Sequence, residues 1–335
     1  MKTILVTGGL GYIGSHICID LLENNYNLVI IDNLSNSNIK KLDIIKKYNK
    51  FDKKIYFYNI DLVNYNNLYK IINELHFKIK IDVIIHLAGL KAVSESIEYP
   101  IKYYENNLVS TLNLTKIMEE FNITNLIFSS SATVYGTTET PYNENSETGK
   151  GITNPYGRSK YIQEEILKDI SAKNKNWNLI ILRYFNPIGH LNTDFKEDPN
   201  GIPNNLFPYL LKVHLGELKE LTIFGSDYHT RDGTCSRDFI NVVDLANAHK
   251  ICCDNILDES IKGLKIYNVG TGIDTTVLEL IRAFEKVNHV KLNYKFGLRR
   301  TGDLMSSYSN VDLIYNDLKW KAKFSIEDSV KSEEI

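Results

Sequence analysis

The sequence predicts an α/β protein with a doubly wound parallel sheet and a second, smaller α/β lobe. Short runs rich in Ile, Leu and Val alternate with segments of helical periodicity through the first half of the chain. A glycine-rich turn follows the first apolar run. After Arg183 the alternation gives way to Pro- and Gly-rich punctuation. We therefore expect one domain over residues 1–183 and another over 184–335, with some later chain returning to the first.

The expected strands are apolar runs of five or six residues: Thr3–Thr7, Asn27–Asp32, Lys54–Tyr58, Asp82–His86, Asn125–Ser129 and Asn178–Arg183. Segments of helical periodicity lie between them: Ile13–Asn24, Lys40–Asn49, Asn66–Leu75, Ile101–Phe121 and Pro155–Ala172. A strand–helix–strand rhythm of this kind is typical of a parallel sheet with helices on both faces. In the second lobe we expect short elements at Leu206–Gly216 and Leu221–Phe224.

Composition excludes several classes of function. The chain has 335 residues, is 43% hydrophobic and 24% charged, and carries a net charge of −2. These values are ordinary for a soluble globular protein, and no basic field points to nucleic acid or to a membrane surface. The longest apolar runs, such as Leu179–Leu182, have the length of a buried strand and are far too short to span a membrane. The four cysteines have neither zinc-site spacing nor a secreted framework, so we predict no metal site and a cytoplasmic protein.

The glycine-rich turn from Gly8 to Gly14 joins the first strand to the first helix. Such a turn brings backbone N–H groups and a helix N-terminus to a pyrophosphate, as in the Rossmann dinucleotide fold. Asp32 ends the second strand, where a carboxylate can accept from the adenosine ribose and repel a 2′-phosphate, which favours NAD over NADP. The alternative is that Asp32 is a strand-end turn residue. Asp61 leaves two interpretations open, an adenine contact or the cap of the helix that follows.

Tyr156 and Lys160 lie four residues apart, on one face of a helix that Asn154 can cap and Pro155 can begin. A free tyrosine has a pKa of about 10, too high for a base at neutral pH. The Lys160 ammonium and a nicotinamide cation would favour the phenolate. Ser131 closes a run of three serines at a strand end and can bond a reacting sugar oxygen. The alternatives are an ordinary amphipathic helix and a polar strand cap, but with the glycine turn these residues indicate hydride chemistry at an alcohol carbon.

Several sequence blocks resemble the UDP-glucose 4-epimerase family of extended short-chain dehydrogenases. They run in family order over nearly the whole chain: Thr7–His16, His86–Val93, Ser129–Gly136, Leu182–Pro187, Gly201–Leu206 and Arg299–Asp303. The resemblance implies an NAD-dependent interconversion of UDP-glucose and UDP-galactose through a transient 4-keto sugar. It also implies a homodimer, with Ile101–Phe121 and Pro155–Ala172 as the expected interface helices.

The resemblance, with the glycine turn, assigns three sets of residues. The catalytic set is Ser131, Tyr156 and Lys160. The NAD set is Gly8, Gly11, Tyr12, Ile13, Gly14, Asp32, Asn33, Ser35, Asn36, Asp61, Leu62, Ala88, Lys91, Asn106, Tyr156, Lys160 and Phe185. The UDP-sugar set is Ser131, Asn186, Asn205, Leu206, Phe224, Arg237, Arg300, Asp303 and Ser307. Arginines can hold a diphosphate through paired N–H groups, although a lone arginine is more often part of a surface ion pair.

One departure from the family pattern bears on substrate range. Ser307 stands where many bacterial members have tyrosine and broad-specificity members have a small residue, so N-acetylated UDP-sugars are possible additional substrates. Two alternatives differ in class. A sugar-nucleotide 4,6-dehydratase would need an Asp-Glu pair where this chain has Ala132-Thr133. A non-catalytic NAD sensor would not require Tyr156 and Lys160.

Overall fold

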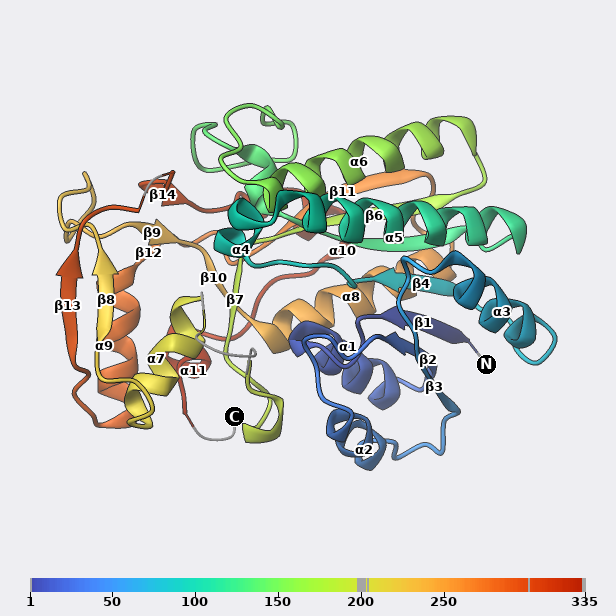
Figure 1. Cartoon of the computed structure of the whole chain (residues 1–335), viewed down its shortest axis with the longest axis horizontal. Coiled ribbons are helices and arrows are strands. Elements are labelled where there is room, and N and C mark those ends of the chain that lie inside the picture. Colours follow the sequence, from blue (N-terminus) through green and yellow to red (C-terminus); the bar gives the residue numbers. More distant parts are fainter. Residues whose placement is uncertain (1, 198–202, 204, 301, 333–335) are drawn as a thin grey trace. The chain divides into compact units, whose positions relative to one another are not determined.

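The computed structural model describes residues 2–197, 203, 205–300 and 302–332 (Figure 1). Contacts within the chain divide it into two compact units. The first unit comprises Met1–Val134, Asn154–Arg183 and Ala246–Tyr267. The second comprises Tyr135–Thr153, Tyr184–Leu245 and Asn268–Ile335. The changeover between residues 183 and 184 coincides with the predicted boundary. The segment 246–267 is later chain within the first unit, while the segment 135–153 lies in the second unit.

The first unit is built around a seven-stranded sheet, counted over the described residues, in the order β11-β6-β5-β4-β1-β2-β3. The pairings of β1 with β2 and β4, of β2 with β3 and of β4 with β5 are parallel. The order reverses between β1 and β4, the switch point at which ligands bind such sheets. This confirms the doubly wound parallel sheet. The strands are β1 Thr3–Thr7, β2 Asn27–Asp32, β3 Ile55–Asn59, β4 Val83–His86, β5 Asn125–Ser131, β6 Asn178–Tyr184 and β11 Leu264–Val269.

Helices cover both faces of this sheet (Figure 1). One layer contains α3, α5 and α6, and the other contains α1, α2 and α8. Within the second layer, the hydroxyl of Tyr26, just after α1, donates to Asp254 of α8. The bounds are α1 Tyr12–Glu23, α2 Lys40–Lys47, α3 Tyr65–His76, α4 Val93–Glu98, α5 Pro100–Glu120, α6 Pro155–Lys173 and α8 Val242–Leu257. A short 3₁₀ turn, η1, covers Ala132–Tyr135. Among the described residues, no helix is long and apolar enough to cross a membrane.

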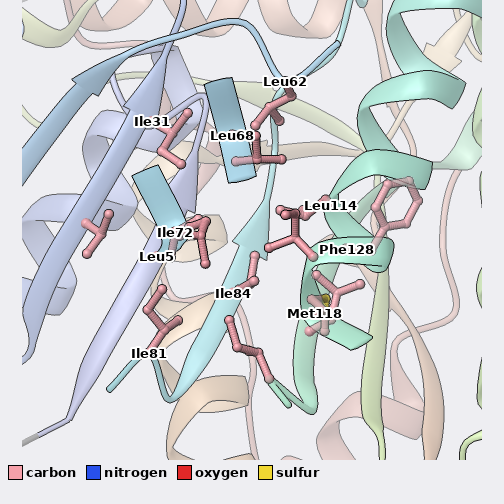
Figure 2. Packing of buried hydrophobic residues seen from close by; sticks show 14 of the residues in the cluster. Leu5, Ile31, Leu62, Leu68, Ile72, Ile81, Ile84, Leu114, Met118 and Phe128 are labelled. Atoms are coloured by element: carbon pink, nitrogen blue, oxygen red, sulfur yellow. The ribbon is translucent and has the colours of Figure 1, made fainter. Parts of the chain in front are cut away.

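One hydrophobic core of the first unit lies between the sheet and the layer of α3, α5 and α6 (Figure 2). Every residue of β1 and β2 is buried. Because both faces of these strands are covered, their central residues are all apolar and do not alternate with polar ones. The helices contribute Leu68 and Ile72 from α3, and Leu114 and Met118 from α5. The four-residue spacing within each pair places these side chains on the helix face toward the sheet.

Two asparagines fix the starts of α6, which carries Tyr156 and Lys160, and of α3, which follows Asp61 and Leu62. Asn154 accepts from the Gly157 N–H at 2.8 Å, and Pro155 takes the first helical position, which confirms the predicted start of α6. Asn64 accepts from the Asn67 N–H at 3.1 Å and caps α3. The interpretation of Asp61 as that cap is therefore wrong.

The second unit combines short strands with a few helices. Its pairings are β10 with β7, β9 with β12 and β14, and β13 with β8. The strands are β7 Asn186–Ile188, β8 Leu221–Phe224, β9 Ser236–Arg237, β10 Phe239–Asn241, β12 Thr275–Thr276, β13 Tyr294–Gly297 and β14 Ser306–Ser307. The helices are α7 Leu206–His214, α9 Val277–Asn288, α10 Asp312–Leu318 and α11 Ile326–Ser329, with a 3₁₀ turn η2 at Thr193–Phe195. Apolar residues of α7, α9 and β8 form its core.

Aromatic contacts hold the segment 135–153 in the second unit. The Tyr135 ring stacks on the Tyr142 ring, with centroids 4.5 Å apart. The Tyr135 hydroxyl donates to Asn268 at 2.6 Å, and Asn268 donates to the Tyr142 carbonyl at 2.9 Å. These contacts explain why the chain leaves the first unit after β5 and returns to it at Asn154.

Candidate active site

The glycine turn precedes α1 at the carboxyl end of β1. Gly8 has φ +68°, and a Cβ on Gly14 would lie 2.2 Å from the Gly8 carbonyl oxygen, so both positions require glycine. Within the described chain, no side chain caps the N-terminus of α1 and its first turn contains no carboxylate. The helix therefore presents an N-terminal dipole and a close backbone approach to an anion, which fits a dinucleotide pyrophosphate.

Asp32 joins this turn to the loop after β2. One carboxylate oxygen accepts from the Leu10 N–H at 3.0 Å. The other accepts from the Leu34 N–H at 2.9 Å and from the Ser37 hydroxyl at 2.7 Å. A carboxylate has about four acceptor sites, so these bonds leave capacity for a ribose hydroxyl. Asp32 is thus both a turn organiser and a candidate ribose contact.

The loops after β2 and β3 meet through Asn33 and Asp61. The Asn33 side chain donates to Asp61 at 3.0 Å and accepts from the Ser35 N–H at 3.1 Å. Leu62 packs within the core, so its side chain is not available to a cofactor. Residues next to Asp61 line an open hollow of about 550 Å³ together with it: Asp61, Val63, Asn64, Tyr65 and Asn66. The hollow lies at Asp61, which the sequence predicts as an NAD contact.

The loop after β4 borders the same turn. The Ala88 N–H donates to the Thr7 hydroxyl at 3.2 Å, and the Lys91 ammonium lies 5.9 Å from the Tyr12 ring centroid. These contacts bring Ala88 and Lys91 to the glycine turn, as the sequence predicts for an NAD site.

Asn107 is a residue of this region that the sequence analysis does not single out. It is fully buried and exchanges hydrogen bonds with both backbone groups of Leu90, at 2.8 and 3.0 Å. It also donates to the Ser159 hydroxyl of α6 at 3.0 Å. The neighbouring Asn106, which was predicted, is half-buried on the same helix. Because the two asparagines are adjacent, nothing in the sequence indicates which of them is the buried one.

The structure brings the expected catalytic residues together where α6 faces the end of β5. The half-buried Tyr156 hydroxyl and the Ser131 hydroxyl share a hydrogen bond. The Lys160 ammonium, one turn later, donates to the Ser129 carbonyl at 2.6 Å and lies 4.8 Å from the Phe128 ring centroid. A phenol, a hydroxyl and an ammonium therefore converge beside the switch point of the sheet.

The electrostatics of this cluster differ from one expectation. Burial raises the pKa of Tyr156, and the hydrogen bond with Ser131 offsets only part of that effect. Burial lowers the pKa of Lys160 to about 7, against the opposing charge of Glu164. The Lys160 ammonium donates to the Ser129 carbonyl and not to Tyr156. The predicted stabilisation of the phenolate by Lys160 therefore does not arise from the chain without its cofactor. Tyr156 remains a phenol until further positive charge is supplied.

In the second unit, two arginines lie beside an aromatic ring and a carboxylate. Arg237 pairs with Asp303 at 2.5 Å and donates to two backbone carbonyls. The Arg300 guanidinium lies 3.9 Å from the Phe224 ring centroid, a cation–π contact. The Asp303 N–H donates to the Arg300 carbonyl at 3.2 Å, which joins the two pairs. Each guanidinium has five donors, so a diphosphate could be bound without breaking these contacts.

Ser307 lies in the strand next to Arg237. The register of β14 and β9 pairs these two residues directly. The Ser307 hydroxyl shares a hydrogen bond with the buried Tyr142 hydroxyl, while the next residue, Tyr308, accepts from the Tyr142 N–H at 3.0 Å. The serine thus lies beside the predicted diphosphate arginine.

The remaining predicted contacts are more scattered. Asn186 is exposed on β7, and Asn205 precedes α7 with its side chain donating to Glu197 at 3.0 Å. Leu206 begins α7 and is half-buried. Phe185 belongs to the second unit, where its ring lies 6.3 Å from that of Tyr142. Within the quoted blocks, positions 201, 202, 204 and 301 lie outside the described residues.

Comparisons with known proteins agree with this geometry. The model of the NAD dependent epimerase/dehydratase family matches residues 4–270. The chain is 47% identical over 330 residues to the UDP-glucose 4-epimerase of Pasteurella multocida (strain Pm70), covering 98% of this chain and 95% of the relative. It is 44% identical over 327 residues to the UDP-glucose 4-epimerase of Bacillus subtilis (strain 168), covering 97% and 94%.

A solved structure gives the same result in three dimensions. The crystal structure of UDP-glucose 4-epimerase from Bifidobacterium longum, in complex with NAD+ and UDP, is similar with a TM-score of 0.91 at 44% identity. The similarity covers 98% of this chain and 96% of that one. The glycine turn, the Ser131–Tyr156–Lys160 cluster and these matches lead to one conclusion: the chain is an NAD-dependent epimerase, and it belongs to the NAD-dependent epimerase/dehydratase family alongside the UDP-glucose 4-epimerases.

Proposed function

We propose that this chain interconverts UDP-glucose and UDP-galactose by reversible oxidation at C4 of the sugar. The observation that carries the proposal is the hydrogen-bonded pair of Tyr156 and Ser131 at the carboxyl end of the sheet, beside the buried Lys160. The proposal is also supported by the relatives named above, which are UDP-glucose 4-epimerases and are similar to this chain over nearly its whole length.

In the proposed mechanism the Ser131 hydroxyl holds the sugar 4-oxygen and the Tyr156 oxygen accepts its proton. NAD, when bound, supplies the hydride acceptor at C4 and a positive ring that favours the Tyr156 phenolate. Lys160, fixed by the Ser129 carbonyl, places its amino group one turn from Tyr156. The 4-keto sugar then turns over, C4 takes the same hydride back on its other face, and Tyr156 returns the proton to the 4-oxygen.

The second unit would hold the part of the substrate that does not react. Arg237 and Arg300 supply fixed N–H groups for the diphosphate, while Phe224 and the asparagines offer stacking and amide contacts to the nucleoside and the sugar. We assign the first unit, with residues 1–134, 154–183 and 246–267, to NAD binding and the second unit to the UDP-sugar. An anchored diphosphate keeps the keto sugar from leaving while the ring rotates.

The test is to incubate the purified protein with UDP-galactose and follow UDP-glucose by NMR. The wild type should yield a mixture of both sugars. Tyr156→Phe should lose about 10³-fold or more in kcat and retain its bound NAD, because the proton acceptor alone is removed. A 4-keto-6-deoxy product would indicate a dehydratase instead. Near-normal turnover by Tyr156→Phe would overturn the assignment of the base.

We further propose that the enzyme accepts UDP-N-acetylglucosamine and UDP-N-acetylgalactosamine. Rotation of the keto sugar turns its C2 substituent toward the wall beside Arg237, where Ser307 lies. An acetamido group is far bulkier than a hydroxyl, and the small Ser307 side chain, held against Tyr142, leaves it room.

Substitution of Ser307 tests this substrate range. Ser307→Tyr should lower kcat/KM for the acetylated pair about 10- to 100-fold and spare the plain pair. Ser307→Ala, which keeps the space, is the matched control and should retain both activities. The idea fails if the wild type ignores acetylated sugars, or if Ser307→Tyr leaves the ratio of the two activities unchanged.

Two further proposals concern the setting of the enzyme. A homodimer is supported by exposed apolar side chains on and next to α4 and α5, namely Ile97, Tyr99, Ile101 and Leu112. A reducing, cytoplasmic location is supported by four free, buried cysteine thiols, and fractionation of cells would test it.

A further inference from the structure

Three consecutive serines end β5, and each contacts a different residue of α6. The Ser129 carbonyl accepts from Lys160 at 2.6 Å. The Ser130 hydroxyl donates to the Glu164 carboxylate at 2.5 Å. The Ser131 hydroxyl bonds Tyr156. Because the three partners are spaced four residues apart, they lie on one helix face, and the strand and helix are joined at three successive points.

Glu164 is the fully buried member of this set, and Arg183 of β6 fixes its orientation. Arg183 approaches one carboxylate oxygen at 2.7 Å through Nη2 and the other at 3.1 Å through Nε. The side chains are 2% and 0% exposed. A bidentate pair of this kind leaves the carboxylate little freedom to rotate, so the oxygen that faces Ser130 is held in place.

This arrangement ties the position of the reacting groups to a residue that does not touch them. Ser130 is 1% exposed, so its hydroxyl donates to Glu164 away from bulk water. The short peptide links on either side place Ser129 and Ser131 relative to Ser130. A shift of the strand at Ser130 relative to Glu164 would therefore move both the carbonyl that holds Lys160 and the hydroxyl that bonds Tyr156.

We propose that Ser130 and Glu164 are positioning residues, which set the register between the Ser131 hydroxyl on β5 and the Tyr156 and Lys160 side chains on α6. The inference rests on the proposed function of those three residues. Arg183 acts through Glu164, as the group that orients its carboxylate. Catalytic geometry is sensitive at this scale, since a misplacement of about 1 Å can cost about 10²-fold in rate.

The test removes the hydroxyl and leaves the ion pair intact, because Glu164→Gln would strand a buried guanidinium and could prevent folding. Ser130→Thr and Ser130→Val provide a matched pair, since they have the same shape and differ in a hydroxyl against a methyl group. We expect Ser130→Val to lower kcat for UDP-galactose about 10- to 100-fold with KM changed less than about twofold, and Ser130→Thr to recover most of the loss. Ser110→Ala removes a buried serine hydroxyl that donates to a carbonyl within α5, and it should leave kcat unchanged.

A merely structural hydroxyl would behave differently. Equal kcat for the Thr and Val variants, or a Ser130→Val variant that loses thermal stability but keeps wild-type kcat, would overturn the inference. Failure of the proposed function is a separate result, because the wild type itself would then produce no UDP-glucose.

Discussion

Lys160 is a side chain whose burial opposes folding while its charge serves the reaction. Its ammonium lies in a site from which water is excluded, with the Ser129 carbonyl, the Phe128 ring and the Glu164 carboxylate as surroundings. The pKa of Lys160 falls to about 7 because burial disfavours the charged form more than Glu164 favours it. A buried lysine of this kind lowers the stability of the folded state at every pH at which its amino group remains protonated.

The pH dependence of this cost has a definite sign. Between about pH 7 and the usual lysine pKa of about 10.4, the unfolded chain binds a proton that the folded chain does not, so stability rises with pH across that window. We expect Lys160→Met to raise the free energy of unfolding by roughly 1–3 kcal/mol at pH 6, after the lost hydrogen bond to Ser129 is subtracted. The gain should shrink as pH rises from 7 to 10. Turnover should be lost.

Urea unfolding of protein prepared without NAD, at several pH values, measures this effect. Lys168→Met is the control, because Lys168 lies on the same helix in a partly exposed pair with Glu165 and should show no such trend. A Lys160→Met variant that is less stable than the control at pH 6 would contradict the assignment of a buried, strained charge.

At the scale of elements, α6 determines where the catalytic side chains lie. Its start is fixed by the Asn154 cap and by Pro155, one residue before Tyr156. Asn154→Ala should cost about 1 kcal/mol of stability and allow the first turn to fray. Because Tyr156 lies in that turn, we also expect kcat to fall several-fold. Kinetics and thermal unfolding of the same preparation measure both effects.

Ser325→Ala is the matched control for the cap, because Ser325 caps α11 in the second unit by the same kind of bond and lies outside every predicted site. It should lose stability without loss of kcat. A fall in kcat of the same size in both variants would show that the effect on rate is unspecific.

The elements that the sequence predicted well share a physical origin. Strands β1 to β6 are apolar runs between helices of clear periodicity, and each was placed to within two residues. The Tyr156–Lys160 spacing and the glycine turn are likewise local patterns. α4, with six residues, and β11 were not predicted, since short elements depend on packing more than on periodicity. The roles of Ser130 and Glu164 could not be predicted, because a bond between residues 34 positions apart leaves no local pattern.

At the scale of the whole molecule, the proposed dimer depends on apolar surface that the described chain leaves exposed. Ile97 and Ile101 are 60% and 72% exposed at the junction of α4 and α5. We expect Ile101→Lys to convert a dimer into monomers, because a charge would be buried without a partner. Light scattering after gel filtration measures the mass. Phe77→Lys, at an 81% exposed position after α3, should leave the mass unchanged. A wild type that is monomeric at all concentrations would contradict the proposal.

The chain passes between its two units five times, since each unit is made of three segments. This route has a consequence for biosynthesis. β11, the strand beside β6, begins at residue 264 of 335, so about four-fifths of the polypeptide must leave the ribosome before the sheet is complete. Until then β6 is an edge with unpaired N–H and C=O groups that can recruit another strand. Nascent or prematurely terminated chains that stop before residue 264 should therefore be the species that engage chaperones or aggregate, whatever the stability of the finished enzyme.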